Sequence, residues 1–472
     1  MAQLWQLSAA QLVEGYKTRL FTPIEALEAC LERVLACEPH LNALVCVDAS
    51  GAREAAAAST QRWSNGEPRS ALDGVPITLK DNLHAKGLAT TWGSRLLGGF
   101  VSPSDEMPVA RLRSAGVVFF AKTNLPEFAM QGYTSNARFG ITRNPWQRDL
   151  TPGGSSGGAA AAVAAGMGPI ALATDGGGSI RRPASHCGLV GFKPSAGLVA
   201  RRGGLPCMFL DYEVVGGIGR SVNDVATLIE ILSQRPMTVP TLQRARILYI
   251  PQFGDTPVDR QIVDEVAAAA RRFSMLGHDV EEQRRFASAD DVNELWPKLS
   301  AVGLAWMLND GDRWRKFGLS DDAHPKVDIC GEAAQTVLRE GSALHATDLF
   351  DLLARVEQLK GELDALFSGY DFLLTPATAA LPWRAEQPFP SEIDGCPVRP
   401  RAHAVFTAFA NAAGLPAIAI PSGFVGALPT GMQLVGKRGA DAALLAMARQ
   451  YEAAYPWIET YRNIRCEQVM PT

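Results

Sequence analysis

Residues 151–194, TPGGSSGGAAAAVAAGMGPIALATDGGGSIRRPASHCGLVGFKP, decide how the rest of the chain is interpreted. They hold two glycine-flanked serine sites, at Ser155 and Ser179, joined by an alanine-rich segment that predicts a buried helix. Glycine accepts positive φ and has no Cβ, so such runs occur where backbone N–H groups must face an anion or a developing oxyanion. A single run of this kind more often marks a flexible loop, but two runs beside apolar segments predict a nucleophilic serine with an oxyanion hole.

A phosphate-binding loop is the nearest alternative for these glycine runs. No Gly-Lys-Ser/Thr follows either run, and no G-x-G-x-x-G opens a helix with an acidic residue in register. The nucleotide interpretation is therefore weak.

Three motifs resemble the signature of the amidase signature family. They are the Gly-Gly-Ser-Ser-Gly-Gly run at 153–158, the Thr-Asp-x-Gly-Gly-Ser-Ile-Arg run at 174–181 and the Cys-Gly-x-Val-Gly-x-Lys-Pro run at 187–194. Upstream, residues 73–82, DGVPITLKDN, resemble the family's lysine-bearing strand end. Similarity covers most of the chain and is weakest across 233–345.

The resemblance implies a Ser/cis-Ser/Lys triad that hydrolyses carboxamides. Ser179 is then the nucleophile, Ser155 the bridging serine in a cis peptide, and Lys80 the base. An ammonium cannot accept a proton, so Lys80 must be neutral at the working pH, which requires desolvation or nearby positive charge. The apolar run before Lys80 predicts that desolvation, although a solvated lysine at a strand end is the ordinary case.

The same resemblance implies roles for further residues around the expected nucleophile. The backbone N–H groups of Gly176, Gly177, Gly178 and Ser179 are expected to form the oxyanion hole. Asp175 and Arg181 are expected to form a structural ion pair. Ser156 has two open interpretations, a hydrogen bond within the triad or the cap of the following helix. His186 is expected to be packed or to form a pocket wall. Family analogy places the acyl pocket at residues 130–136, with Met130, Gln131 and Tyr133 as lining candidates.

Composition bounds the remaining possibilities. The chain has 472 residues, 47% of them hydrophobic and 20% charged, which suits one large α/β domain or two smaller ones. A net charge of −4 without a long basic stretch argues against nucleic acid as a partner. Eight cysteines without metal-binding spacing predict reduced thiols in a cytoplasmic protein. No signal pattern or long apolar run indicates a membrane partner.

The resemblance implies a single large α/β domain over 1–472, with a mixed central β-sheet flanked by helices. Its predicted parts are a helical N-terminal part (1–62), a catalytic core with the signature (73–230), a variable covering part (233–345) and a core-completing C-terminal part (365–460). Helices are predicted to begin after Ser8 and Thr22. Where many relatives have Leu-Asp-x-x-Gly-Pro, residues 210–220 read LDYEVVGGIGR. The conformation of this loop near the pocket is therefore not predicted. For the tryptophans at 296, 306 and 314, a core or dimer surface is preferred over a substrate entrance.

The predicted function is hydrolysis of a small-molecule carboxylic amide through a seryl acyl-enzyme, releasing ammonia or an amine, with no cofactor or metal. Three alternatives stay open: the glutaminase (A) subunit of a tRNA-dependent amidotransferase, a hydrolase of related esters or hydrazides, and a catalytically silent binding subunit. The resemblance also leaves a homodimer open.

Overall fold

A mixed β-sheet forms the centre of the computed structural model, which describes residues 3–238, 242–284, 286, 289–316, 318–319, 325–464 and 466. Within these residues the sheet has 11 strands. In spatial order they are β1 (Leu44–Val47), β3 (Val118–Thr123), β2 (Pro76–Lys80), β6 (Ile170–Asp175), β8 (Val214–Gly219), β7 (Val190–Lys193), β14 (Ala417–Val425), β15 (Leu428–Gly436), β11 (Phe372–Pro376), β9 (Arg246–Tyr249) and β10 (Asp279–Glu282).

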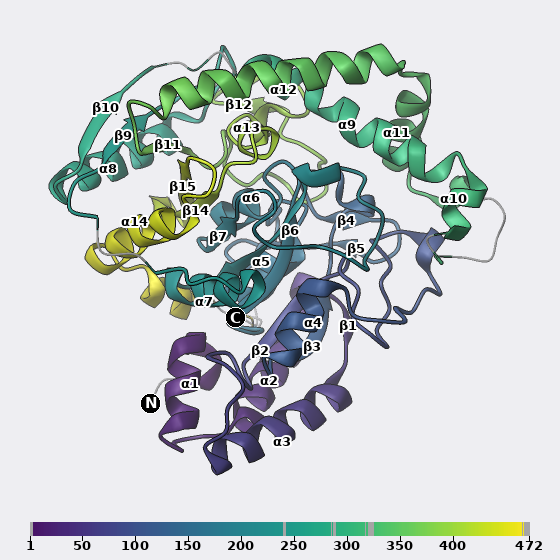
Figure 1. Ribbon diagram of the computed structural model, residues 1–472, viewed down its shortest axis with the longest axis vertical. Helices are drawn as coiled ribbons and strands as arrows, with labels where there is room; N and C mark the ends of the chain where they lie inside the picture. The colour runs from purple at the N-terminus through teal and green to yellow at the C-terminus, as the bar shows by residue number, and fades with distance from the viewer. Residues whose placement is uncertain are drawn as a thin grey trace, which may run out of the picture.

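Helices surround this sheet, which confirms the predicted fold class (Figure 1). They are α1 (Ala9–Lys17), α2 (Pro23–Leu41), α3 (Ala49–Asn65), α4 (Met107–Ser114), α5 (Gly157–Ala164), α6 (Arg181–His186), α7 (Val222–Ser233), α8 (Arg260–Met275), α9 (Asp290–Leu308), α10 (Gly311–Lys316), α11 (Glu332–Ala343), α12 (Ala346–Leu366), α13 (Ala408–Ala412) and α14 (Asp441–Ala454). Two small hairpins pair β4 (Ser135–Asn136) with β5 (Gly140–Ile141) and β12 (Glu392–Ile393) with β13 (Cys396–Pro397).

The first two α-helices begin where the sequence predicts. Ser8 caps α1 and Thr22 caps α2, each in a capping box closed by the side chain three residues later. Thr22 Oγ1 accepts from the Glu25 amide at 3.2 Å, and Glu25 Oε2 accepts from the Thr22 amide at 2.7 Å. The polar caps satisfy amide groups that the helix itself cannot pair.

The alanine-rich segment between the serine sites is a helix only in its first half. Helix α5 ends at Ala164, and Gly166 (φ 85°) and Gly168 (φ 99°) then turn the chain into strand β6. These left-handed glycines, followed by Pro169, cannot continue a helix. Strand β6 is instead buried between β2 and β8. The prediction of one buried helix is therefore wrong for the second half of the segment.

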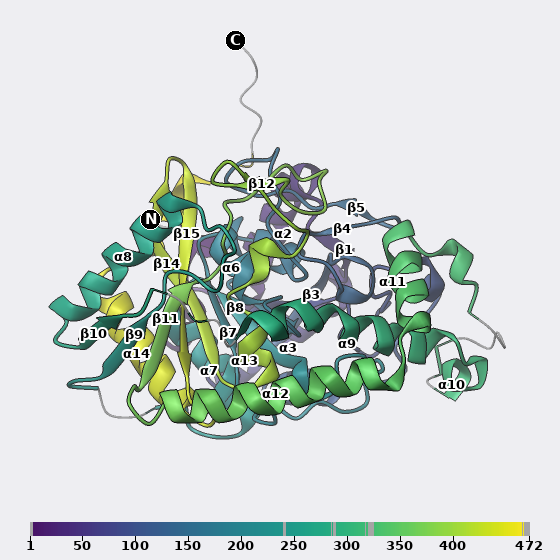
Figure 2. The same cartoon turned by 90° about the horizontal axis from the view of Figure 1, so that it is seen from above.

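The 233–345 part both extends the sheet and covers it. Strands β9 and β10 are parallel to β11 and form one edge, so this part is more than the predicted cover. In Figure 1, α12 runs along the top of the molecule and α9, α11 and α10 follow on its right side, away from α1 and α3 at the bottom. Figure 2 shows α9 and α12 crossing one side of the molecule.

A disulfide joins Cys37 in α2 to Cys466, 429 residues later in sequence. The prediction that the cysteines are reduced thiols is therefore wrong for this pair, because the fold brings two distant buried segments together near the two ends of the chain. Cys30, Cys46, Cys187, Cys207, Cys330 and Cys396 are free. Within the described ranges, no helix has both the length and the apolar character needed to cross a bilayer.

Candidate active site

Two neighbouring parallel strands deliver the central residues of the site. Strand β2 lies parallel to β6, with Leu79 opposite Leu172, so their carboxyl ends meet at one edge. Lys80 is the last residue of β2, and Asp175 is the last residue of β6. Ser179 lies in the loop between β6 and α6, and Ser155 lies just before α5. The predicted lysine and both serine runs therefore reach the same part of the fold.

The Lys80 amine is enclosed by three oxygen atoms. Nζ lies 2.8 Å from Ser155 Oγ, 3.0 Å from Thr174 Oγ1 and 3.3 Å from the Thr174 carbonyl oxygen. The carbonyl can only accept a hydrogen bond, and Thr174 Oγ1 also accepts from Asn82 Nδ2 at 2.9 Å. A neutral amine can direct its two N–H groups to Thr174 and its lone pair to Ser155.

Burial decides the charge of Lys80. The side chain has no solvent exposure, and desolvation lowers its pKa from 10.5 to about 7. Arg201 and Arg182 add to the lowering, whereas the carboxylates of Glu213 and Asp175 oppose it. The amine is therefore available as a base near neutral pH.

The peptide bond between Gly154 and Ser155 is cis, as the resemblance implies for the bridging serine. Ser156 occupies the N-cap position of α5 without a capping bond from its side chain. Its Oγ instead donates to the Thr174 carbonyl at 3.3 Å, the same oxygen that Lys80 contacts. Of the two interpretations of Ser156, the structure favours hydrogen bonding beside the triad.

Ser179 is tied to this serine run through its backbone. Its carbonyl accepts from the Ser156 amide at 3.1 Å, and its residue exposure is 8%. Among the described residues, no hydrogen bond joins the hydroxyls of Ser155 and Ser179. The structure thus brings Lys80 and Ser155 into contact, with Ser179 on the adjacent loop.

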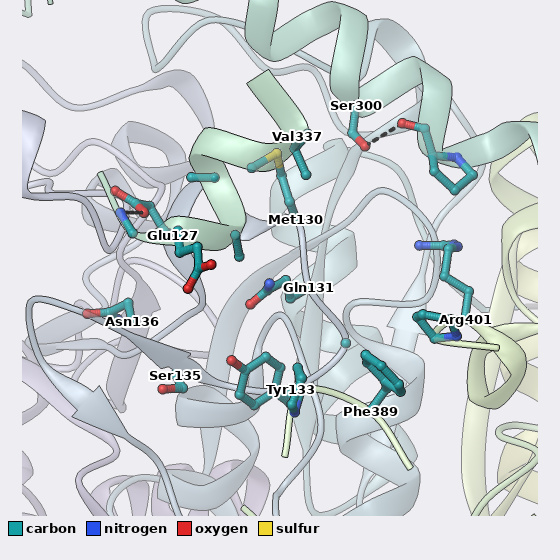
Figure 3. A pocket seen from close by; sticks show the side chains of 18 of the residues that line it. Glu127, Met130, Gln131, Tyr133, Ser135, Asn136, Ser300, Val337, Phe389 and Arg401 are labelled. Atoms are coloured by element: carbon teal, nitrogen blue, oxygen red, sulfur yellow. Dashed lines mark hydrogen bonds between the residues drawn. The ribbon is translucent and has the colours of Figure 1, made fainter. Parts of the chain in front are cut away.

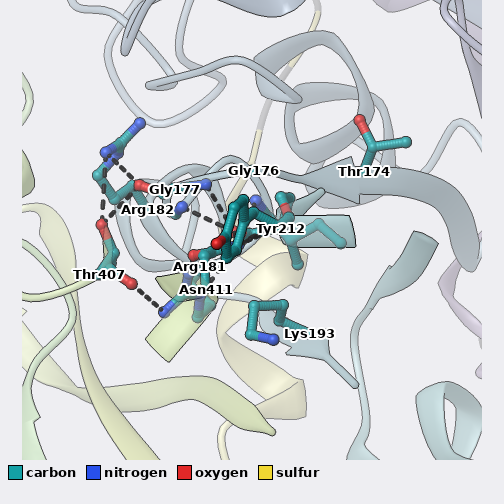
Figure 4. A network of polar contacts seen from close by, with 12 residues as sticks. Thr174, Gly176, Gly177, Arg181, Arg182, Lys193, Tyr212, Thr407 and Asn411 are labelled. Atoms are coloured by element: carbon teal, nitrogen blue, oxygen red, sulfur yellow. Dashed lines mark hydrogen bonds and ion pairs between the residues drawn. The ribbon is translucent and has the colours of Figure 1, made fainter. Parts of the chain in front are cut away.

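Asp175 fixes the loop that carries Ser179 from inside. Figure 4 shows two of its partners, Arg181 and Asn411, beside Gly176 and Gly177 of that loop. Arg181 donates to both of its carboxylate oxygens, at 3.0 and 2.8 Å, and both side chains are fully buried. Asn411 Nδ2 donates to the carboxylate and to the Asp175 carbonyl. Burial alone would raise the pKa of Asp175, but the Arg181 guanidinium holds it well below its usual range. The expected structural ion pair is present.

The oxyanion-hole expectation differs in one respect from the structure. The amides of Gly177 and Gly178 donate to Asp175 Oδ1, at 3.2 and 2.7 Å. The Gly176 carbonyl accepts from Trp296 Nε1 at 3.0 Å, which fixes the same peptide from its other side. In the described part of the chain, the amides of Gly176 and Ser179 have no hydrogen-bond partner. These two amides, rather than all four, are available to a substrate oxygen.

A cavity of about 670 Å³ lies beside the loop that carries Ser179, and Figure 3 shows residues that line this cavity. Met130, Gln131 and Tyr133 all line it, in agreement with the predicted pocket segment. A smaller pocket of about 30 Å³ contains Ser179 and shares part of the larger cavity's wall. The shared residues are Met130, Gln131, Arg182, Ser300 and Arg401. The small pocket is therefore the inner end of the larger one.

Sequence reasoning assigned no role to several residues around the triad. Thr174 and Asn82 stood inside the matching motifs, so their positions beside Lys80 carried a usable signal. No sequence signal pointed to Glu213, because it lies in the divergent 210–220 stretch. It nevertheless lines the Ser179 pocket, and its carboxylate accepts a hydrogen bond from Asn82 at 3.3 Å. Trp296 belongs to the core, as preferred, and also lines this pocket.

His186 is a packed residue, and no hydrogen bond joins its ring to Ser155 or Ser179 among the described residues. Its Nε2 lies 3.2 Å from the Ala380 carbonyl, and its ring meets Trp383 edge-on. Burial lowers the pKa of His186 to about 4. The interpretation of this histidine as packed agrees with the structure.

Known proteins are similar to this chain in sequence and in fold. The family described as Amidase matches residues 25–445. The A subunit of a glutamyl-tRNA(Gln) amidotransferase from Symbiobacterium thermophilum is 34% identical, covering 94% of this chain and 96% of that protein. A bacterial aryl acylamidase of the amidase signature enzymes has a TM-score of 0.87 at 28% identity, covering 99% of each chain. The amidotransferase A subunit from Thermotoga maritima has a TM-score of 0.76 at 27% identity, covering 97% of this chain and 96% of that one. The chain therefore belongs to the amidase signature family.

Proposed function

We propose that this amidohydrolase cleaves the C–N bond of a small-molecule carboxylic amide through an acyl-enzyme on Ser179. The observation that carries the proposal is the Lys80 amine, buried in contact with Ser155 at 2.8 Å and with a pKa of about 7. A serine hydroxyl becomes a good nucleophile only when a neighbouring base removes its proton. Lys80 supplies that base without a histidine.

In the first half-reaction, Ser155 passes a proton to Lys80 and takes the proton of Ser179. This relay requires the hydroxyls of Ser155 and Ser179 to come into hydrogen-bond contact in the substrate complex. Ser179 Oγ then bonds to the carbonyl carbon, and the substrate oxygen gains negative charge beside the Gly176 and Ser179 amides.

The tetrahedral intermediate collapses when the C–N bond breaks. Ser155 returns a proton to the leaving nitrogen, which departs as ammonia or an amine. In the second half-reaction, water attacks the ester carbonyl and the same relay takes its proton, releasing the carboxylic acid and restoring Ser179. Overall, one amide and one water give one acid and one amine.

Ser179→Ala tests the nucleophile. The variant should lose turnover and fold normally, and a fluorophosphonate probe should label the wild-type protein at Ser179 only. Undiminished turnover in the variant would remove Ser179 from this role. Failure of the probe to label Ser179 would favour a silent binding subunit.

A second candidate is the glutaminase subunit of a tRNA-dependent amidotransferase. The 34% identity to an amidotransferase A subunit over nearly the whole chain favours it. Purified protein assayed alone on aliphatic, aromatic, cyclic and carbamoyl amides separates the two, because a free-standing amidase acts without a partner. The same panel extended to esters and hydrazides tests the leaving group. A cytoplasmic location and a homodimer stay predictions, to be checked by cell fractionation and light scattering.

A further inference from the structure

Two arginines meet beside the nucleophile without an acidic partner. Arg182 and Arg401 line both the small pocket that contains Ser179 and the larger cavity next to it. Arg182 is buried on α6, three residues after the nucleophile, and Arg401 comes from the C-terminal part of the chain. Both side chains therefore face the space where a substrate must bind.

Protein atoms satisfy Arg182 only in part. Its Nη1 donates to the Gly177 carbonyl at 2.9 Å and its Nη2 to the Gly154 carbonyl at 3.2 Å. Its buried Nε has no hydrogen-bond partner. Among the residues that the structure describes, no hydrogen bond or ion pair engages the Arg401 guanidinium. Arg181 gives the contrast, since Asp175 neutralises it within the same loop.

The carboxylates that border the cavity do not balance this charge. Glu213 lines the Ser179 pocket, but its Oε2 accepts from Arg201 Nη1 at 2.9 Å. Glu127 lies across the cavity from Arg401 in Figure 3 and accepts from Ser94 and from the Gly331 amide. Glu332 and Glu340 also line the larger cavity, but neither lines the small pocket that contains Ser179. The end of the cavity nearest Ser179 therefore carries positive charge without a paired carboxylate among the described residues.

A third polar group faces the same cavity. His403 is 4% exposed and lines the larger cavity, and neither of its ring nitrogens has a hydrogen-bond partner. Burial and the two arginines lower its pKa well below the ordinary value, so the imidazole is neutral. Burial also lowers the pKa of Arg182 to about 9, with Arg401 contributing, and that of Arg401 to about 10, which leaves both cationic near pH 7.

We infer that Arg182 and Arg401 bind a carboxylate carried by the amide substrate close to its scissile carbonyl. Buried charges are costly unless they are paired, and a guanidinium fork matches a carboxylate in shape and hydrogen bonding. Ser179, Arg182 and Arg401 line the same small pocket, so this carboxylate lies only a few bonds from the reacting carbon. The inference deepens the proposed function and rests on it: the substrate class is short amides of acidic character.

Arg401→Gln is the informative variant, because Arg401 has no described partner to lose. Arg182→Gln would also release the carbonyls of Gly154 and Gly177, which hold the serine loops. Arg399→Gln is the matched control, since it removes the same charge two residues away from a side chain that is 90% exposed.

The test compares succinamic acid with butyramide, which replaces the carboxylate by a methyl group. In the wild type, kcat/KM should be at least about tenfold higher for succinamic acid. Arg401→Gln should lower that value by about ten- to a hundredfold and change the butyramide value by less than about twofold. Arg399→Gln should change neither. Equal rates for the two amides in the wild type, or equal losses for both in Arg401→Gln, would overturn the inference.

A binding measurement decides the anion site without turnover. Calorimetry should detect succinate binding to Ser179→Ala and show it about tenfold or more weakened when Arg401→Gln is added. Absence of succinate binding would overturn the anion site. Loss of the proposed function has a different signature: no amide is cleaved and Ser179 is not labelled by fluorophosphonate, even where succinate binds.

Discussion

The pH dependence of turnover tests the protonation state of Lys80. A solvated lysine titrates near 10.5, so about three molecules in ten thousand carry a neutral amine at pH 7. Burial lowers the pKa of Lys80 to about 7, so about half of the molecules carry one. The fold therefore raises the fraction of competent base at neutral pH by roughly 1,500-fold.

This fraction predicts the shape of the rate profile. Below pH 7, kcat/KM should rise about tenfold per pH unit, and it should level off above about pH 8. The Glu213 carboxylate raises the pKa of Lys80, so Glu213→Gln should move the rising limb to lower pH. Lys80→Ala should lose about 10²–10⁴-fold in rate. Ammonia release, followed between pH 5 and 10, measures kcat/KM for the wild type, Glu213→Gln and Lys80→Ala.

Lys193 provides the matched control. It is also buried with a pKa lowered to about 7, but its Nζ donates to the Pro194 carbonyl instead of to a serine. Lys193→Met should therefore keep the rising limb. Three results would refute Lys80 as the base. The wild-type kcat/KM could stay flat between pH 6 and 8, it could rise only near pH 10, or Lys80→Ala could show the same rise with pH as the wild type.

Two further predictions concern stability. Asp175→Asn leaves Arg181 buried without its anion and should lower the free energy of unfolding by about 3–5 kcal/mol. Asp279→Asn breaks the exposed pair with Arg244 and should cost less than about 1 kcal/mol in the same urea titration; equal losses would contradict the role of burial. Cys466→Ser should lower the free energy of unfolding by about 2–4 kcal/mol. Intact mass after alkylation without reductant should show six modified cysteines in the wild type, whereas eight would contradict the disulfide.

Much of the reactive centre follows from local sequence. The glycine runs around Ser155 and Ser179 and the strand end at Lys80 are contiguous motifs, and each keeps its local form in the fold. Helix caps at Ser8 and Thr22 are likewise decided by side chains three residues apart. The secondary structure of the alanine-rich segment was harder to predict, because a buried helix and a buried strand have the same apolar composition. Pairing with neighbouring strands decides between them.

The sequence by itself indicated the family, because the signature motifs are residue types at short spacings. The mixed α/β class and the expected roles of Lys80, Ser155 and Ser179 followed from that resemblance. Only the tertiary structure decided what surrounds them. Arg401 meets Arg182, Glu213 approaches Lys80, and Cys37 reaches Cys466 across long stretches of chain. Burial, charge balance and the pKa of Lys80 are sums over neighbours in space, and the folded path of the chain selects those neighbours.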